Sequence, residues 1–347
     1  MADPFFIVGT ERSGSNLLRL VLNSHSRLLV PHPPHVMNQL GSLEASYGEE
    51  RFSELARDVS RFIRWHTYPW EVTPSGVELE RTCPSRDLFG LFAAAYRACL
   101  EHSGKARWGC KSTFMIHHAP RILRSLPEAR FLWLVRDPRD VAVSARKSVF
   151  CHFHPYHVAR LWSREQRVGL ELEQTLGPRQ VLRIHYERLV QDPPSEVRRI
   201  CNFLEEPYEE GMLSFFESRE ARRSASLCAD WQNTDRGFLA GNTGRWKGRL
   251  GARDLALLEA VAEAEMEALG YPFATSPEER RGLLPVHPLR LGLFWLDEWV
   301  QRVRVEARSL RQDRNFPLRA RKYLHLLYLR GKAFLRSRTP APPATPP

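Results

Sequence analysis

FFIVGTERSGSN, residues 5–16, joins an apolar run to a turn that bears glycine and serine. Residues 5–9 predict a short buried strand, and the apolar residues at helical spacing in 17–22 predict that the turn opens a helix. At such a turn, successive backbone N–H groups can face an anion, and the helix N-terminus adds positive potential. The stretch therefore indicates an anion site, with a serine-rich helix cap as the alternative.

The side chains of this turn favour phosphate binding without triphosphate hydrolysis. Its two glycines, Gly9 and Gly14, have the spacing of a Walker A loop, but Ser15 stands where that motif has lysine. A nucleotide triphosphatase needs this lysine on the β- and γ-phosphates. The charged and polar side chains available in the turn are Arg12, Ser13, Ser15 and Asn16.

A second segment has matching chemistry. FLWLV at residues 131–135 is the clearest buried strand, and Pro138 suits the first turn of the helix that follows. Arg136 stands at the carboxyl end of this strand, where ligands gather in open α/β sheets. A guanidinium there and the hydroxyl of Ser144 suit a terminal phosphate. The alternative is a surface salt bridge with a serine on a helix face.

Strands alternate with helices along the chain. Further strands are expected at 28–30 and 181–184, and helices at about 48–105, 194–205 and 252–269. This order predicts an α/β fold, with a P-loop-like parallel sheet flanked by helices on both faces.

The excess positive charge lies in one region. The net charge is +11, and residues 286–338 hold 13 Arg/Lys and 4 Asp/Glu. The body of the protein is therefore nearly neutral, and without a nucleic-acid reader motif we expect no nucleic-acid partner. We predict a domain at 1–285, a basic amphipathic helical extension at 286–338 and a disordered tail at 339–347. The extension could contact an anionic membrane surface, or its helices could pack on the domain.

Location and metal content follow from what the sequence lacks. No apolar run approaches the ~20 residues of a membrane-spanning helix, and the N-terminus does not resemble a secretory signal. We therefore expect a cytoplasmic protein. The six cysteines include no Cys-x-x-Cys pair, so reduced thiols and no metal site are expected.

Together, the two phosphate-binding segments resemble the sulfotransferase superfamily, which uses 3′-phosphoadenosine 5′-phosphosulfate (PAPS). Arginine in the loop is similar to the bacterial and tyrosylprotein-type branch. The resemblance implies that the loop residues Arg12, Ser13, Gly14, Ser15 and Asn16 hold the 5′-phosphosulfate. It implies that Arg136 and Ser144 hold the 3′-phosphate.

Three later segments also resemble the family, and the resemblance runs from about residue 4 to 272. Lys111 lies in a stretch that resembles the family's lysine-bearing segment. Tyr186 lies in a stretch that resembles its Tyr-Glu-x-Leu segment, whose tyrosine contacts the nucleotide. Arg245 and Trp246 match the segment that closes over the cofactor. In the implied reaction, Arg12 and Lys111 stabilise the charge that builds on the departing phosphate. PAPS supplies the activated group, so no metal is required.

The general base departs from the family pattern. Related enzymes place a glutamate soon after the second strand, but residues 30–36 read VPHPPHV and contain no carboxylate. Histidine titrates near neutral pH and can act as the base. His32 and His35 are the two candidates, and the sequence does not choose between them.

The sequence thus predicts a sulfotransferase that acts on a hydroxyl of a small molecule, glycan or lipid. Two alternatives stay open: a P-loop kinase or nucleotidase, and a catalytically inactive nucleotide-binding protein. The aromatic residues Trp65, Tyr68 and Trp70, with His66, could line an acceptor site or could simply pack between helices. The sequence does not indicate the acceptor, the pathway or the oligomeric state.

Overall fold

The computed structural model describes residues 3–68 and 70–338. The chain forms two compact units, each built from two stretches of sequence. The first unit comprises residues 1–31 and 109–314, and the second comprises residues 32–108 and 315–347.

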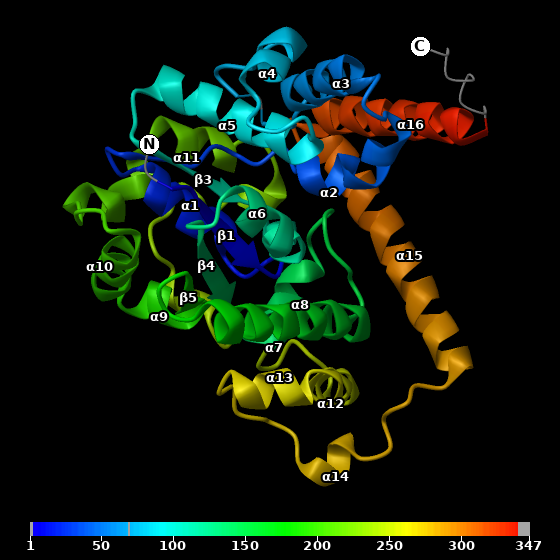
Figure 1. Ribbon diagram of the computed structural model, residues 1–347. Helices are drawn as coiled ribbons and strands as arrows, with labels where there is room; N and C mark the ends of the chain where they lie inside the picture. Colours follow the sequence, from blue (N-terminus) through cyan, green and yellow to red (C-terminus); the bar gives the residue numbers. More distant parts are fainter. Residues whose placement is uncertain (1–2, 69, 339–347) are drawn as a thin grey trace. The chain divides into compact units, whose positions relative to one another are not determined.

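A five-stranded sheet organises the first unit, with the strand order β2-β3-β1-β4-β5. Figure 1 labels β1, β3, β4 and β5. Strand β1 pairs in parallel with β3 and β4, and β4 pairs in parallel with β5. The predicted α/β fold with a parallel, helix-flanked sheet is therefore confirmed. The strands are β1 (Phe5–Gly9), β2 (Leu28–Leu29), β3 (Arg107–Lys111), β4 (Arg130–Val135) and β5 (Val181–His185).

The register of the sheet brings the two phosphate-binding segments together. Gly9, the last residue of β1, pairs with Leu134, and Val135 at the end of β4 pairs with His185. The carboxyl ends of β1, β4 and β5 are thus nearly level. Strand order reverses at β1, because β2 and β3 lie on one side of it and β4 and β5 on the other. Ligands of open α/β sheets bind at such a reversal.

Alternate strand residues pack under helices on opposite faces, as the period of a strand requires. Ile7, Leu132 and Ile184 are fully buried in a cluster with apolar residues of α1 (Ser15–Asn23) and α10 (Pro193–Leu204). On the other face, the indole of Trp133 donates to Gln166 of α8 (Pro155–Leu176) at 3.0 Å. Helices therefore cover both faces of the sheet.

The remaining helices of the first unit follow the strands in chain order. Pro138 is the first residue of α7, as predicted. The 3-10 helices are η2 (Thr113–His118), η3 (Glu210–Glu217), η4 (Ala229–Trp231) and η5 (Ala240–Asn242). The α-helices are α6 (Ala119–Ser125), α7 (Pro138–Ala145), α9 (Tyr186–Gln191), α11 (Arg219–Ala225), α12 (Ala252–Val261), α13 (Glu263–Ala268), α14 (Pro277–Arg280) and α15 (Pro288–Gln312).

The second unit is helical. Tyr96 lies at the centre of an aromatic group, with its ring centroid 5.0 Å from the rings of both Trp70 and Trp108. Helix α3 (Phe52–Arg64) buries Leu55, Val59 and other apolar residues. The helices are α2 (Val36–Leu40), η1 (Gly41–Ser46), α3 (Phe52–Arg64), α4 (Gly76–Thr82), α5 (Leu88–Ser103) and α16 (Phe316–Arg338).

The predicted extension at 286–338 forms α15, in the first unit, and α16, in the second. Its helical character is as expected, while the domain boundary predicted at residue 285 stays a prediction. The tail predicted at 339–347 lies outside the described residues. Among the residues that the structure describes, no helix has both the length and the apolar character needed to cross a membrane.

Candidate functional site

The turn after β1 has an unusual backbone. Arg12 and Gly14 both have positive φ angles, 68° and 92°. A Cβ added at Gly14 would lie 2.4 Å from the Tyr186 ring, at the start of α9. Glycine is therefore required at this position for two reasons, the left-handed backbone and the close approach of the ring.

The Arg12 side chain joins three parts of the first unit. Its Nε donates to the Ser144 hydroxyl at 3.1 Å, and its NH1 donates to Asp230 at 2.7 Å. Arg12 comes from the turn after β1, Ser144 from α7 and Asp230 from η4. The two residues predicted for separate phosphate groups, Arg12 and Ser144, are thus in direct contact.

Arg136 ties the two phosphate-binding segments together. Its guanidinium donates to the carbonyl of Arg12 at 3.0 Å and to the carbonyl of Asn242 at 2.7 Å. It also stacks over the Tyr186 ring, 4.2 Å from the centroid, and the Asn242 amide donates to the Tyr186 hydroxyl. Arg136, Tyr186 and the turn after β1 therefore form one packed site.

Three buried donors of this site have no hydrogen-bond partner within the described ranges. They are the Ser13 hydroxyl, Nδ2 of Asn16 and Nε of Arg136. Ser15 is buried at the first turn of α1, while Oδ1 of Asn16 accepts a hydrogen bond from Arg19 at 2.8 Å. Because buried donors are normally satisfied, their grouping at a strand–helix turn indicates that an acceptor-rich ligand is their partner.

Lys111 stands at the carboxyl end of β3, and its ammonium interacts with the carboxylate of Glu11 in the turn. Burial, reinforced by the charge of Arg19, lowers the pKa of Lys111 to about 8. Burial also raises the pKa of Glu11 to about 6, although Lys111 opposes this shift. The pair places a titratable cation beside the turn.

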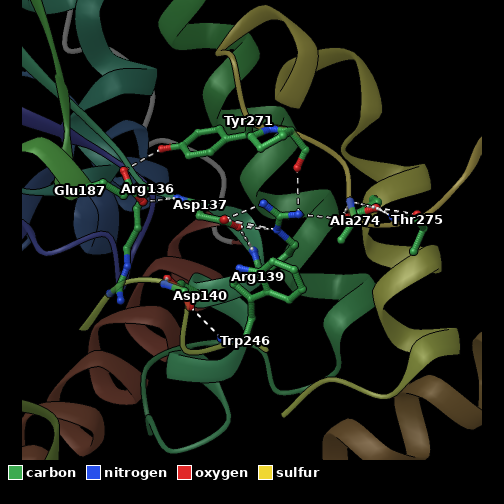
Figure 2. Close-up of polar contacts among 12 residues, drawn as sticks. Arg136, Asp137, Arg139, Asp140, Glu187, Trp246, Tyr271, Ala274 and Thr275 are labelled. Atoms are coloured by element: carbon green, nitrogen blue, oxygen red, sulfur yellow. Dashed lines mark hydrogen bonds and ion pairs between the residues drawn. The ribbon is translucent and has the colours of Figure 1, made fainter. Parts of the chain in front are cut away.

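The segment with Arg245 and Trp246 is fastened to α7. Asp140 accepts hydrogen bonds from the backbone N–H of Gly244 at 2.7 Å and from that of Trp246 at 2.9 Å; Figure 2 shows the second. The Arg139 guanidinium lies over the Trp246 ring, 4.2 Å from its centroid. Arg245 donates to the side chain of Asn242 at 2.7 Å. The predicted cofactor-closing segment therefore lies against the helix that carries Ser144.

A buried ionic network lies beside this segment (Figure 2). Arg139 donates to Asp137 at 2.8 Å and to Glu259 at 2.8 Å. The backbone N–H of Asp137 donates to Glu187, which also accepts from the Tyr271 hydroxyl at 3.1 Å. The network connects the start of α7 to α9 and α12, and so holds the carboxyl end of β4 in place.

The two candidate bases belong to the second unit. His32 is buried, and its Nδ1 lies 2.9 Å from Nε2 of His66. Its carbonyl accepts from the Trp70 indole at 2.6 Å. His35 is half-buried, has a φ of 60° and precedes α2.

The aromatic residues considered for an acceptor wall are largely packed within the second unit. Tyr68 and Trp70 are buried, and Trp70 meets Tyr96 edge to face. Tyr68 stacks on His32, with ring centroids 5.3 Å apart. These contacts match the packing interpretation for Trp70 and bring Tyr68 beside a candidate base.

A family model described as "Sulfotransferase family" matches residues 4–210, which is more than half of the chain. The chain belongs to the sulfotransferase family. The resemblance inferred from the two phosphate-binding segments is therefore confirmed at the level of the family.

Relatives of this sulfotransferase-family chain include proteins named protein-tyrosine sulfotransferase, at low sequence identity. It is 22% identical over 290 residues to the protein-tyrosine sulfotransferase of Drosophila melanogaster, covering 79% of this chain and 52% of that protein. It is 24% identical over 288 residues to protein-tyrosine sulfotransferase 1 of Danio rerio, covering 80% of this chain and 74% of that protein. An uncharacterised protein of Aquifex aeolicus is 24% identical over 256 residues, covering 70% and 30%. The chain thus spans only a third to a half of the length of some of these relatives.

Two solved structures share the fold. The sulfotransferase domain of the Synechococcus PCC 7002 olefin synthase aligns with a TM-score of 0.53 at 20% identity, covering 78% of this chain and 96% of that one. The sulfotransferase domain of the curacin biosynthetic pathway aligns with a TM-score of 0.51 at 19% identity, covering 79% and 99%.

Three acidic or amide residues of the site were not predicted from the sequence. Asp230 and Asn242 lie in a segment without strong periodicity, and only the fold brings them to Arg12 and Arg136. Asp140 had a signal that could have been used, because it directly follows the Arg-Asp-Pro-Arg run at the start of α7. An acidic residue in a first helical turn is a common N-terminal feature, so by itself it did not indicate a clamp.

Proposed function

We propose that the protein binds PAPS and transfers its sulfuryl group to the hydroxyl of an acceptor. The observation that carries this proposal is the meeting of the two phosphate-binding segments. Arg136 donates to the carbonyl of Arg12, and Arg12 donates to Ser144, although the turn and α7 are far apart in sequence. Two segments that each suit an anion thus meet, which supports a nucleotide with two phosphate positions as the ligand.

The buried donors of the site fit an anionic substrate. Leaving the Ser13 hydroxyl, the Asn16 amide and Nε of Arg136 unsatisfied costs roughly 1–3 kcal/mol each. Oxygens of phosphate and sulfate would satisfy such donors. In the proposed complex, the residues that bind the phosphosulfate are Arg12, Ser13, Gly14, Ser15 and Asn16. Arg136 and Ser144 bind the 3′-phosphate. Tyr186, Arg245 and Trp246 contact the rest of the nucleotide.

The reaction requires positioning and positive charge. The acceptor oxygen forms a bond to sulfur as the bond from sulfur to the bridging oxygen breaks, and the electron pair leaves with the 3′,5′-bisphosphate. Arg12, Lys111 and the N-terminus of α1 stabilise that charge. Lys111 carries its proton at neutral pH, since its pKa is about 8. The proposed mechanism requires no metal, because PAPS carries the activated group itself.

His32 acts as the general base in this proposal, and His35 is the second candidate. His32 is favoured because its ring and its carbonyl are both held, by His66 and by Trp70. A base must be fixed within hydrogen-bond reach of the proton that it removes. Replacing His32 by Ala should abolish transfer and leave nucleotide affinity unchanged. Unchanged turnover in that variant, with loss in a His35→Ala variant, would move the role to His35.

The cofactor is tested by calorimetric titration with 3′-phosphoadenosine 5′-phosphate, beside ATP with magnesium. We expect tight binding of the bisphosphate, which Arg136→Ala loses and Arg179→Ala keeps, because Arg179 is an exposed arginine outside the site. ATP binding that depends on magnesium, without bisphosphate binding, would favour a kinase or nucleotidase instead. Bisphosphate binding without turnover across all acceptors would favour an inactive nucleotide-binding protein.

The acceptor is a hydroxyl-bearing molecule. Relatives named protein-tyrosine sulfotransferase make the phenol of a tyrosine peptide the first acceptor to test. Small-molecule alcohols, glycans and lipid hydroxyls complete the panel. Transfer of radiolabelled sulfate from PAPS to one class identifies the acceptor chemistry.

We further propose a cytoplasmic location with membrane contact through α15. The support is an exposed apolar stripe on this helix, opposite the buried Glu298 and Val305. Arg290, Arg304 and Arg308 flank the stripe, which suits anionic headgroups. The exposed apolar residues that form the stripe are Leu289, Leu293, Leu296, Trp299, Val303 and Leu310.

Sedimentation with vesicles that contain phosphatidylserine tests this contact. The full chain should partition with the vesicles, and a Trp299→Glu variant should partition measurably less. Val77→Glu, which adds the same charge at an exposed apolar site on α4, is the control. Equal partitioning of all three proteins would contradict the proposal.

A further inference from the structure

The buried rings of His32 and His66 and the half-buried Lys322 form a continuous chain of hydrogen bonds in the second unit. Nδ1 of His32 lies 2.9 Å from Nε2 of His66, and Nδ1 of His66 lies 3.1 Å from Nζ of Lys322 on α16. Each nitrogen of the His66 ring thus meets one partner. Nε2 of His32 lies on the side of its ring away from His66, at the end of the chain opposite Lys322.

Both ends of this chain are fixed in place. Nζ of Lys322 also donates to the carbonyl of Pro34 at 3.0 Å and lies 4.5 Å from the centre of the Phe62 ring. His32 is held by the Trp70 indole on its carbonyl and by Tyr68 stacked on its ring. The three groups therefore have a fixed geometry through which a proton can pass.

The protonation state of Lys322 decides the direction of every hydrogen bond in the chain. A charged ammonium can only donate to His66, which then donates from Nε2 to His32 and leaves the neutral His32 ring protonated on Nε2. A neutral amine can accept instead. His66 then donates to Lys322, His32 donates from Nδ1 to His66, and Nε2 of His32 carries a lone pair.

We propose that His66 and Lys322 are a proton relay that sets the base form of His32 and receives the proton that His32 removes. This inference rests on the proposed function, because it assigns two positioning residues to the proposed base. Lys322 acts through His66, and His66 acts through His32.

The proton balance of the relay is complete. During transfer, the acceptor hydroxyl gives its proton to Nε2 of His32. The proton on Nδ1 of His32 passes to Nε2 of His66, and the proton on Nδ1 of His66 passes to the amine of Lys322. The step leaves both rings neutral, each with its proton on Nε2, and Lys322 as an ammonium. Before the next turnover Nε2 of His32 gives its proton to solvent, His66 returns its Nε2 proton to Nδ1 of His32, and Lys322 returns one proton to Nδ1 of His66.

The surroundings of Lys322 suit a proton acceptor. Burial lowers its pKa to about 7, and among the residues that the structure describes no carboxylate forms an ion pair with it. An ordinary lysine would stay charged and could not accept. The segments that contact Lys322 carry further titratable or charged groups. They are His32, His66 and Tyr68 from the facing segments, Arg319, Arg321 and His325 from α16 itself, and Asp58 from α3, which pairs with Lys332.

The first test reads the tautomer of His32 without using activity. Long-range ¹H–¹⁵N correlation spectra of histidine-labelled full-length protein distinguish a proton on Nδ1 from one on Nε2. At about pH 8.5, above the lowered pKa of Lys322, we expect His32 to be protonated on Nδ1. A Lys322→Arg variant, which stays charged and can only donate, should show the proton on Nε2. A His32 proton on Nε2 in the unsubstituted protein at this pH would overturn the relay.

The second test uses the pH dependence of sulfate transfer. In the full chain, kcat should rise with pH through about 7, as Lys322 loses its proton. Lys322→Arg should lower kcat by roughly tenfold or more at neutral pH, because the base form of His32 is lost. Lys322→Met should also lower kcat and remove the inflection near pH 7. Both should leave the affinity for 3′-phosphoadenosine 5′-phosphate unchanged.

Lys332→Met is the matched control, since Lys332 lies on the same helix and pairs with Asp58, outside the relay. We expect its pH profile to match that of the unsubstituted protein. A Lys322→Met enzyme with the same kcat and the same inflection as Lys332→Met would overturn the relay. If the proposed function itself fails, no variant will transfer sulfate or bind the bisphosphate, and the tautomer spectra still decide whether the relay exists.

Discussion

The guanidinium of Arg12 donates to the carboxylate of Asp230 across 2.7 Å, although 218 positions separate them in the sequence. The Asp230 side chain is almost fully buried, with 3% exposed, and Arg12 is 22% exposed. A carboxylate therefore already occupies one donor of the arginine that is proposed to hold the phosphosulfate. Substrate anions must compete with it or share the guanidinium with it.

Replacing Asp230 by Asn should tighten the binding of 3′-phosphoadenosine 5′-phosphate by about tenfold, because the charge of Arg12 is no longer compensated. The free energy of unfolding should fall by about 1–3 kcal/mol in the absence of nucleotide, since a buried ion pair loses one partner. Calorimetry and chemical denaturation measure the two effects. Asp235→Asn makes the same charge change at an exposed position nearby, and equal gains in both variants would rule out a specific role for Asp230.

Gly14→Ala should abolish nucleotide binding and destabilise the first unit. The added Cβ would combine a φ of 92° with a contact of 2.4 Å to the Tyr186 ring, which Arg136 covers. Gly104→Ala is the matched control, because Gly104 has a φ of 67° and no atom within 4 Å of an added Cβ. It should cost only about 1 kcal/mol of backbone strain. Thermal denaturation and calorimetry of both variants separate backbone strain from steric clash. Similar losses of stability and of nucleotide affinity in the two variants would contradict the prediction.

The affinity for the bisphosphate should fall as pH rises through about 8. Burial lowers the pKa of Lys111 to about 8, so its positive charge is present below that pH and lost above it. Bound phosphate favours the charged form, so the decline moves to higher pH as the site fills. Lys111→Arg keeps its charge and should give an affinity that is flat between about pH 7 and about pH 9. Calorimetric titrations across this range decide the matter: an unsubstituted protein with a flat profile would remove Lys111 from the binding site.

Stability should fall between about pH 4.5 and about pH 8 because of Glu165. This carboxyl of α8 is fully buried, and burial raises its pKa from 4.5 to about 8, against a smaller opposing interaction with the Thr10 hydroxyl. In this window the unfolded chain releases a proton that the folded protein keeps, so rising pH favours unfolding by up to about 5 kcal/mol. Below about pH 4.5 both states are protonated, and above about pH 8 the loss is complete.

Glu165→Gln replaces the protonated carboxyl by a neutral group of similar shape. The free energy of unfolding of this variant should therefore depend less on pH. Chemical denaturation at about pH 6 and about pH 8.5 measures the difference. The exposed Glu171→Gln, on the same helix, should behave like the unsubstituted protein. A Glu165→Gln variant that loses stability with pH as steeply as the Glu171→Gln control would show that another group causes the effect.

Much of the fold could be predicted from local sequence. Uniform apolar runs at 5–9 and 131–135 indicated β1 and β4, and Pro138 correctly indicated the start of α7. Strand β3, in contrast, was not predicted, because Arg107 and Lys111 stand at its ends and Gly109 at its centre. It forms a strand because β1 offers a parallel partner, with Phe5 opposite Gly109, and this partnership is a long-range property.

The candidate site shows the same division. Arg12, Arg136 and Ser144 could be singled out because each stands at a recognisable strand–turn–helix junction. Their direct contact could not be predicted, since it depends on the register of β1 against β4.

The sequence by itself determined the residue types at the ends of the strands, the α/β alternation and the resemblance to the sulfotransferase family, because these are local patterns of polarity and turn chemistry. The tertiary structure alone decided which groups meet. Asp230 reaches Arg12, and Lys322 reaches His66, across stretches of chain that carry no local mark of either contact. Hydrogen bonds and burial act only over a few ångströms, so the protonation states that they set exist only once the fold has brought these side chains together.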